Sequence, residues 1–215
     1  MAIATARMLG YELTANFNFP YFSASITDFW RRWHISLSTW LRDYLYIPLG
    51  GNRGSKLFTY RNVMVTMLLG GLWHGASWTF VIWGGMHGLA LIAHREWERL
   101  TKGAGNRLQA VMCLFGPLLC FYWVCVTWVL FRSAPLFDET THELKASGLR
   151  VAQTILHAFV LGQDNGSRTF TSECVYVLAA LVLAHWIAAR GLFTRLWRRL
   201  PPLAFAALLG ILTAL

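Results

Sequence analysis

A histidine interrupts an apolar stretch of this chain at Gly70-Gly71-Leu72-Trp73-His74-Gly75-Ala76, and the apolar character extends over residues 62–94. Ionisable side chains are costly inside segments of membrane length, and they usually persist there because they have a function. A second histidine lies earlier in the chain, in Phe29-Trp30-Arg31-Arg32-Trp33-His34-Ile35-Ser36. His74 and His34 are therefore the first candidates for a functional site.

The composition is typical of a membrane protein. Of the 215 residues, 56% are hydrophobic and 13% are charged, whereas soluble domains carry about 25% charged residues. Mean hydropathy is +0.44, and the 11 tryptophans and 14 phenylalanines suit membrane interfaces and packed membrane helices. We therefore predict an all-α, multi-pass integral membrane protein.

The net charge of +9 is concentrated between the apolar runs. Basic residues cluster in 31–61, 95–107 and 190–199, which is the pattern of cytoplasmic loops under the positive-inside rule. This distribution argues against a nucleic-acid partner, because no soluble basic face is indicated. It favours contact with membrane lipid instead.

The cysteine pattern indicates neither a disulfide framework nor a metal site. All four cysteines lie in or at the edge of apolar segments, and no two of them have CxxC spacing. We expect them to act as small hydrophobic side chains in helices. They are Cys113, Cys120, Cys125 and Cys174.

The segment that carries His34 predicts a cytoplasmic helix and loop over residues 1–61. The run Ser25-Ile26-Thr27-Asp28 is a capping box, which predicts a helix over residues 27–46. On such a helix His34 would share one face with Trp30 and Leu41.

The apolar residues 62–94 are too many for one straight span and too few for two, since a span needs about 20 residues. Three glycine-containing interruptions permit bends in the segment. Irregular backbone at membrane depth is tolerated only where protein or a cavity surrounds it. We therefore predict re-entrant or short tilted helices around a buried His74.

The rest of the chain predicts three further membrane segments, over residues 108–131, 174–189 and 200–215. Residues 132–171 are polar and would form an extracytoplasmic loop, within which 142–160 suit an amphipathic interfacial helix.

The candidate residues have a functional and a structural interpretation. His74 would be a general base, or a packing histidine that binds a neighbouring carbonyl. His34 would be its partner, or a structural residue of its helix. The basic residues near His34 suit equally the phosphates of a cytoplasmic donor and anionic lipid headgroups. They are Arg31, Arg32, Arg42, Arg53 and Lys56, and Arg42-Asp43-Tyr44 would form a buried network that fixes the helix.

A third histidine, His87, invites comparison with the paired axial ligands of haem proteins. Such a site needs a matching pair on a second helix. The later membrane segments offer only His185, so a haem site is not supported. We expect His94, His142, His157 and His185 to be ordinary structural or surface residues.

Three stretches of the chain resemble the membrane-bound O-acyltransferase (MBOAT) family, and within it the bacterial alginate O-acetyltransferase branch. The first runs from Asn18-Phe19-Pro20-Tyr21-Phe22 through Asp28-Phe29-Trp30-Arg31-Arg32-Trp33-His34 to Pro48-Leu49-Gly50-Gly51-Asn52-Arg53. The others are Gly71-Leu72-Trp73-His74-Gly75-Ala76-Ser77-Trp78 and Trp83-Gly84-Gly85-Met86-His87-Gly88.

The resemblance implies that His74 is the catalytic histidine of an acyl-transfer site and that His34 is its partner. It implies acetyl-CoA as a cytoplasmic donor substrate, no tightly bound cofactor and no metal. The acceptor would be a hydroxyl on the other side of a bacterial inner membrane. The acetyl group would pass toward periplasmic partner proteins that acetylate an alginate-like exopolysaccharide.

Family members are longer than this chain. The resemblance therefore implies that residues 1–215 are the C-terminal part of a single domain whose N-terminal half is missing, and that the chain alone would be inactive. The alternative function is a non-catalytic membrane scaffold or export component that binds a periplasmic partner. Only the enzyme requires His34 and His74 to converge.

Overall fold

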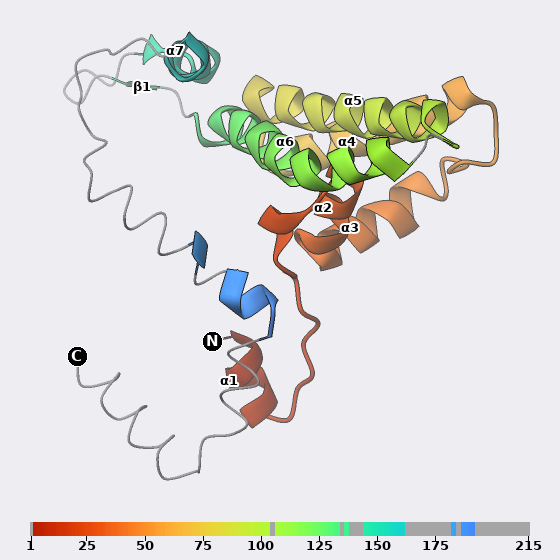
Figure 1. The fold of residues 1–215 in the computed structure, drawn as a ribbon. Helices are drawn as coiled ribbons and strands as arrows, with labels where there is room; N and C mark the ends of the chain where they lie inside the picture. Colours follow the sequence, from red (N-terminus) through yellow and green to blue (C-terminus); the bar gives the residue numbers. More distant parts are fainter. Residues whose placement is uncertain are drawn as a thin grey trace. The chain divides into compact units, whose positions relative to one another are not determined.

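The computed structural model describes residues 2–103, 106–133, 136–137, 144–161, 182–183 and 186–191. The described residues are mostly helical, which confirms the predicted helical class (Figure 1). A short antiparallel pair of strands, β1 and β2, is the exception. The elements in order are α1 (Ala2–Met8), η1 (Pro20–Phe22), α2 (Ile26–Arg32), α3 (Ile35–Leu41), η2 (a π-helical turn, Arg42–Tyr46), α4 (Lys56–Trp73), α5 (Trp78–Leu100), α6 (Asn106–Arg132), β1 (Leu136–Phe137), β2 (Leu144–Ala146) and α7 (Gly148–Leu161).

The chain divides into two compact units, residues 1–163 and 164–215, and all of these elements belong to the first. Most of the predicted membrane segment 174–189, and all of 200–215, lie outside the described residues. Within the part that is described, one helix is long and apolar enough to cross a membrane, at Leu114–Arg132 in α6.

The apolar stretch 62–94 folds into parts of two helices, α4 and α5, that pack along each other as a hairpin (Figure 1). The break between them covers residues 74–77. Gly75 there has φ 153°, and a Cβ at this position would lie 2.9 Å from the Phe80 ring. Ser77 then begins α5 by accepting a hydrogen bond from the backbone N–H of Thr79.

The helix predicted over residues 27–46 is wrong as a single element. Ser25 does cap α2, since its hydroxyl accepts from the Asp28 backbone N–H at 3.1 Å. The helix then ends at Arg32, because Trp33 is extended and His34 is left-handed with φ 43° and ψ 56°. His34 consequently lies at the start of α3 and not on a shared face with Trp30 and Leu41.

Two asparagines of the preceding connector stabilise this break. The carbonyl and the side-chain oxygen of Asn16 accept from the backbone N–H groups of Ile35 and Ser36, both at 2.9 Å. The backbone N–H of Asn18 donates to the Arg32 carbonyl, also at 2.9 Å. The backbone N–H and carbonyl groups that lose their helical partners at the break therefore form hydrogen bonds with the connector. These bonds stabilise the end of α2 and the start of α3.

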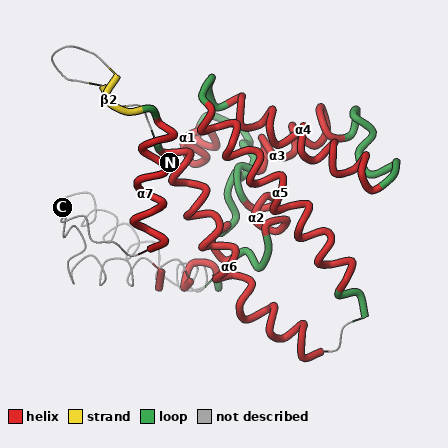
Figure 2. The backbone as a smooth tube through the Cα atoms, turned by 90° about the horizontal axis from the view of Figure 1, so that it is seen from above, coloured by secondary structure: helices red, strands yellow, loops and turns green. Residues whose placement is uncertain are grey.

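The core lies where α2, α5, α6 and α7 meet. Phe29 of α2 packs with Cys120 and Val124 of α6, and the Trp33 ring stacks on Phe29 at 5.7 Å. A second buried cluster takes one residue from each of three helices, namely Trp83 of α5, Leu130 of α6 and Ala152 of α7. Figure 2 shows α7 beside α6. Residues 132–171 thus contain a helix that covers part of this core.

Candidate active site

His74 caps the C-terminus of α4, at the turn into α5. Its ring lies among four aromatic rings, with centroid distances of 4.9 Å to Trp73, 4.9 Å to Phe131, 5.4 Å to Trp83 and 6.2 Å to Phe80. The predicted burial of His74 is partial within the described residues, since the side chain is half-buried. The reason is its position in the exposed turn between two helices and not within one of them. An aromatic wall with an open side suits a residue that must meet a substrate.

His34 occupies the N-terminal position of α3 in a left-handed conformation that non-glycine residues seldom adopt. The side chain is half-buried, and its ring lies 6.1 Å from the Phe17 ring. Within the described part of the chain, its buried Nδ1 atom has no hydrogen-bond partner. Strained backbone and an unpaired ring nitrogen together are typical of functional sites.

The two candidate histidines lie near enough for their charges to influence each other. Burial disfavours the protonated form of His74, and a charge on His34 would disfavour it further. Two imidazoles in this relation disfavour simultaneous protonation, because like charges repel at short range. Burial and this repulsion together favour the neutral form of His74, which accepts a proton.

A cavity of about 620 Å³ lies between the α2–α3 segment, η2, α4 and α5. Three arginines from different elements line it, namely Arg31, Arg42 and Arg95, together with hydroxyl groups and an apolar floor that includes Trp30. His34 and His74 are not among its lining residues, although Ile35, which follows His34 in the sequence, is. The lining also includes the Glu98 carboxylate, so its charge is net positive, which suits a ligand that carries both negative charge and apolar groups.

The predicted buried network at Arg42-Asp43-Tyr44 is wrong. Arg42 Nε donates to Asp43 Oδ1 at 2.7 Å, but the two side chains are 61% and 40% exposed, and Tyr44 is 68% exposed. The hydrogen bond from Arg42 holds the pKa of the Asp43 carboxyl below its ordinary value. Both side chains of the pair reach solvent, so the network is not buried, and Arg42 also borders the open cavity.

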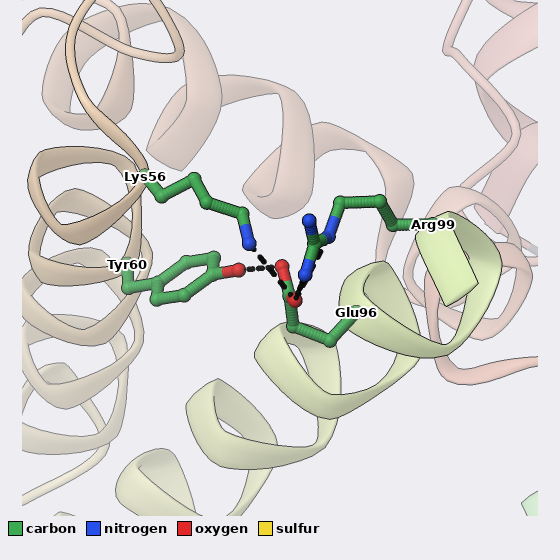
Figure 3. A network of polar contacts seen from close by, with 4 residues as sticks. All are labelled: Lys56, Tyr60, Glu96 and Arg99. Atoms are coloured by element: carbon green, nitrogen blue, oxygen red, sulfur yellow. Dashed lines mark hydrogen bonds and ion pairs between the residues drawn. The ribbon is translucent and has the colours of Figure 1, made fainter.

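A polar cluster that the sequence analysis missed connects the start of α4 to the end of α5 (Figure 3). Glu96 Oε2 accepts from Lys56 Nζ at 3.1 Å and from Arg99 Nε at 3.0 Å, while the Tyr60 hydroxyl donates to Oε1. Partial desolvation raises the pKa of Glu96, but the two cations outweigh it and hold the pKa below its ordinary value. Only the Glu96–Arg99 spacing was visible in the sequence.

The remaining histidines have different surroundings. His94 Nδ1 forms a hydrogen bond with the Thr27 hydroxyl at 3.2 Å, which agrees with a structural role, and His157 is exposed. His142 and His185 lie outside the described residues. His87 is fully buried, which its spacing from His74 did not indicate. In the described residues, no three His, Cys, Asp or Glu side chains come together as a metal site.

Residues 2–134 match the membrane-bound O-acyltransferase family, MBOAT, and the chain belongs to this family, as its motifs indicated. It is 47% identical over 188 residues to the probable alginate O-acetylase AlgI of Azotobacter vinelandii, covering 80% of this chain and 36% of that protein. It is 53% identical over 137 residues to the probable alginate O-acetylase AlgI of Pseudomonas aeruginosa, covering 63% and 25%.

A peptidoglycan O-acetyltransferase of Helicobacter pylori is 46% identical over 136 residues, covering 63% of this chain and 25% of that protein. The chain thus spans between a quarter and about a third of the length of these relatives.

Proposed function

We propose that this chain carries the catalytic residues of a multi-pass membrane O-acetyltransferase. The enzyme moves an acetyl group from a cytoplasmic thioester to a hydroxyl on the other side of the bacterial inner membrane. The proposal rests on the membership of the chain in the MBOAT family and on the aromatic rings that surround His74, the histidine of its motif. A non-catalytic scaffold would have no need of two interacting histidines beside an aromatic wall.

In the proposed reaction, His74 accepts the proton of the acceptor hydroxyl as its oxygen attacks the thioester carbonyl carbon. The tetrahedral intermediate collapses, the carbon–sulfur bond breaks, and the departing thiolate takes the proton from His74. The products are an O-acetyl ester and a free thiol, and His74 is neutral again. Burial favours the neutral, proton-accepting form of the His74 ring, and His34 acts as its partner.

The arginine-lined cavity supports acetyl-CoA as the donor. Arginine binds phosphate through a planar fork of N–H groups, and Arg31 and Arg95 come to the cavity from α2 and α5. The apolar floor beneath them suits the uncharged arm of the donor. Anionic lipid would compete for the same guanidinium groups, so the cavity supports the donor without distinguishing it from a lipid headgroup.

A polysaccharide hydroxyl is the proposed acceptor. Relatives named for alginate and for peptidoglycan O-acetylation are 46–53% identical to the chain. We infer an alginate-like exopolysaccharide, reached through periplasmic partner proteins. Since the chain covers a minority of each relative, we propose that a preceding N-terminal half walls the site.

The test is polysaccharide-bound acetate in cells whose own transferase is deleted. They are complemented with the chain, with the chain extended upstream to the length of its relatives, and with His74→Ala versions of both. We expect the extended form to restore acetate and His74→Ala to abolish it at equal membrane abundance. Restoration by the His74→Ala form would contradict the catalytic role and favour the scaffold.

A further inference from the structure

His87 of α5 is the most completely enclosed ionisable side chain among the described residues. Its exposed fraction is 0%, and three aromatic rings surround it. The centroid distances are 4.8 Å to Trp83, 5.3 Å to Trp30 and 6.2 Å to Phe29. These neighbours belong to α2 and α5. The described residues are therefore sufficient to bury the His87 side chain.

The nitrogens of this cluster make no hydrogen bonds within the described residues. This holds for both ring nitrogens of His87 and for the indole Nε1 atoms of Trp30 and Trp83. A buried polar group without a hydrogen bond costs free energy, and a phenylalanine of similar size would fill the same space without that cost. Packing alone therefore does not explain a histidine here.

The ring geometry shows what the imidazole does contact. His87 meets Trp30 at an interplanar angle of 81° and Trp83 at 63°, both edge-to-face arrangements. In such pairs the positive edge of one ring lies on the negative face of the other, and an imidazole N–H, which a phenyl ring lacks, donates more strongly to such a face than a C–H does. Trp83 and His87 are four residues apart on α5, so they share one face of the helix. The histidine thus supports the Trp83 indole in one orientation.

Trp83 connects this buried cluster to the proposed site. Its ring lies 5.4 Å from the His74 ring at 89° and 5.2 Å from Phe131, which itself lies 4.9 Å from His74. One side of the indole thus contacts His87 and another contacts His74. A change in the tilt of Trp83 would move the wall against which the His74 ring rests.

We propose that His87 is a positioning residue for His74 that acts through the Trp83 indole. The predicted effect of His87 on reaction rate rests on the proposed acyl-transfer function. The link between the rings is a property of the fold and is measurable by itself. His87 does not touch the acceptor or the donor.

The test compares His87→Phe, which keeps the ring and removes the nitrogens, with His87→Gln, which restores an N–H group. An exposed matched control, His157→Phe on α7, makes the same chemical change outside the cluster. The first readout is the rate at which diethyl pyrocarbonate modifies His74, measured by mass spectrometry in the upstream-extended protein in membranes, with His157 as the internal reference. In the His157→Phe control, which lacks that reference, the partly exposed His94 takes its place.

We expect His87→Phe to change the His74 modification rate severalfold, His87→Gln to return it toward wild type, and His157→Phe to leave it unchanged. The second readout is acetyl transfer per folded protein. We expect His87→Phe to lower kcat about 10-fold to 100-fold with little change in the KM for the donor, since small misplacements of catalytic groups have effects of this size. The pH midpoint of kcat should shift as well.

A merely structural role would lower the amount of folded protein without changing either the His74 modification rate or the pH midpoint. Equal modification of His74 in wild type and His87→Phe would overturn the inference. If modification depends on His87 but no variant transfers acetyl groups, the ring coupling stands and the proposed function fails. If transfer depends on His74 but not on His87, the proposed function stands and this inference fails.

Discussion

Gly71 of α4 faces Gly84 of α5 so closely that a Cβ on either would lie 2.3 Å from a backbone carbonyl oxygen of the opposite helix. These oxygens belong to Phe80 and Met67. Small residues at such a crossing let two helices approach closely in a membrane protein. The crossing lies three residues before His74, so it fixes the place where the candidate catalytic histidine leaves α4.

Replacing Gly84 by alanine is expected to force the hairpin apart, because the clash is with backbone and not with a movable side chain. Overpacking of this kind typically costs about 1–3 kcal/mol. The measurement is the thermal unfolding midpoint of the detergent-solubilised, upstream-extended protein. The matched control is Gly85→Ala, whose Cβ would lie 3.5 Å from Leu68 Cδ2, an ordinary contact. Equal midpoints for the two variants would contradict the close crossing.

His34 combines a left-handed backbone conformation with a polar ring. Substitutions can test separately whether the site needs the backbone conformation or the polar side chain. His34→Ala removes the ring and strains the backbone, so we expect a large loss of transfer activity. His34→Asn keeps a polar group and tolerates the left-handed region, so it should retain more activity than His34→Ala. Rates are compared per folded protein. Full activity of His34→Ala would remove His34 from the mechanism.

The Glu96 cluster predicts a pH-dependent contribution to the stability of the α4–α5 hairpin. Since the pKa of Glu96 is lower in the folded protein, the cluster stabilises the fold above the ordinary carboxyl pKa of 4.5. That stabilisation is lost as the pH falls through the lower, folded-state pKa. Glu96→Gln should therefore lower the unfolding midpoint at pH 7 and have a smaller effect as the pH falls below 4.5.

Glu98→Gln is the matched control for this change, because Glu98 is 65% exposed and its carboxylate lies 3.8 Å from His94 Nδ1. We expect it to shift the midpoint less at pH 7. An effect of Glu96→Gln that stays constant down to pH 3 would show that its charge does not stabilise the hairpin.

The arginine-lined cavity predicts a donor-specific effect. Arg95→Gln should raise the KM for acetyl-CoA severalfold and leave the KM for an acetyl-thioester without phosphates unchanged. Arg53→Gln, the same charge change at an exposed residue that does not line the cavity, should have little effect on either. Equal effects of the two variants on the KM for acetyl-CoA would indicate that the overall surface charge attracts the donor, and that the cavity is not a specific donor site.

The sequence predicted much of the helical framework because the signals there are local. The Ser25 cap, the interruption at His74-Gly75 and the long apolar helix near 108–131 depend on neighbouring residues. The left-handed turn at His34 was not predictable, because its stabilising partner Asn16 reaches it across a connector.

The contacts that complete the site are also non-local. Lys56 and Glu96 meet only because the hairpin folds back on itself. The full burial of His87 depends on Trp30 and Phe29 from a separate helix. The apolar context and the motifs indicated the candidate site residues, but they did not indicate which rings would surround them.

The central claim is that His74 is the base of acyl transfer, and the most direct measurement is ester formation by the purified protein. The upstream-extended chain is placed in liposomes with acetyl-CoA and a mannuronate oligosaccharide, and acetyl ester is quantified. We expect His74→Ala to lose activity by about 100-fold or more, the usual contribution of a general base, with the exposed control His157→Ala at the wild-type rate. Wild-type ester formation by folded His74→Ala would contradict the account.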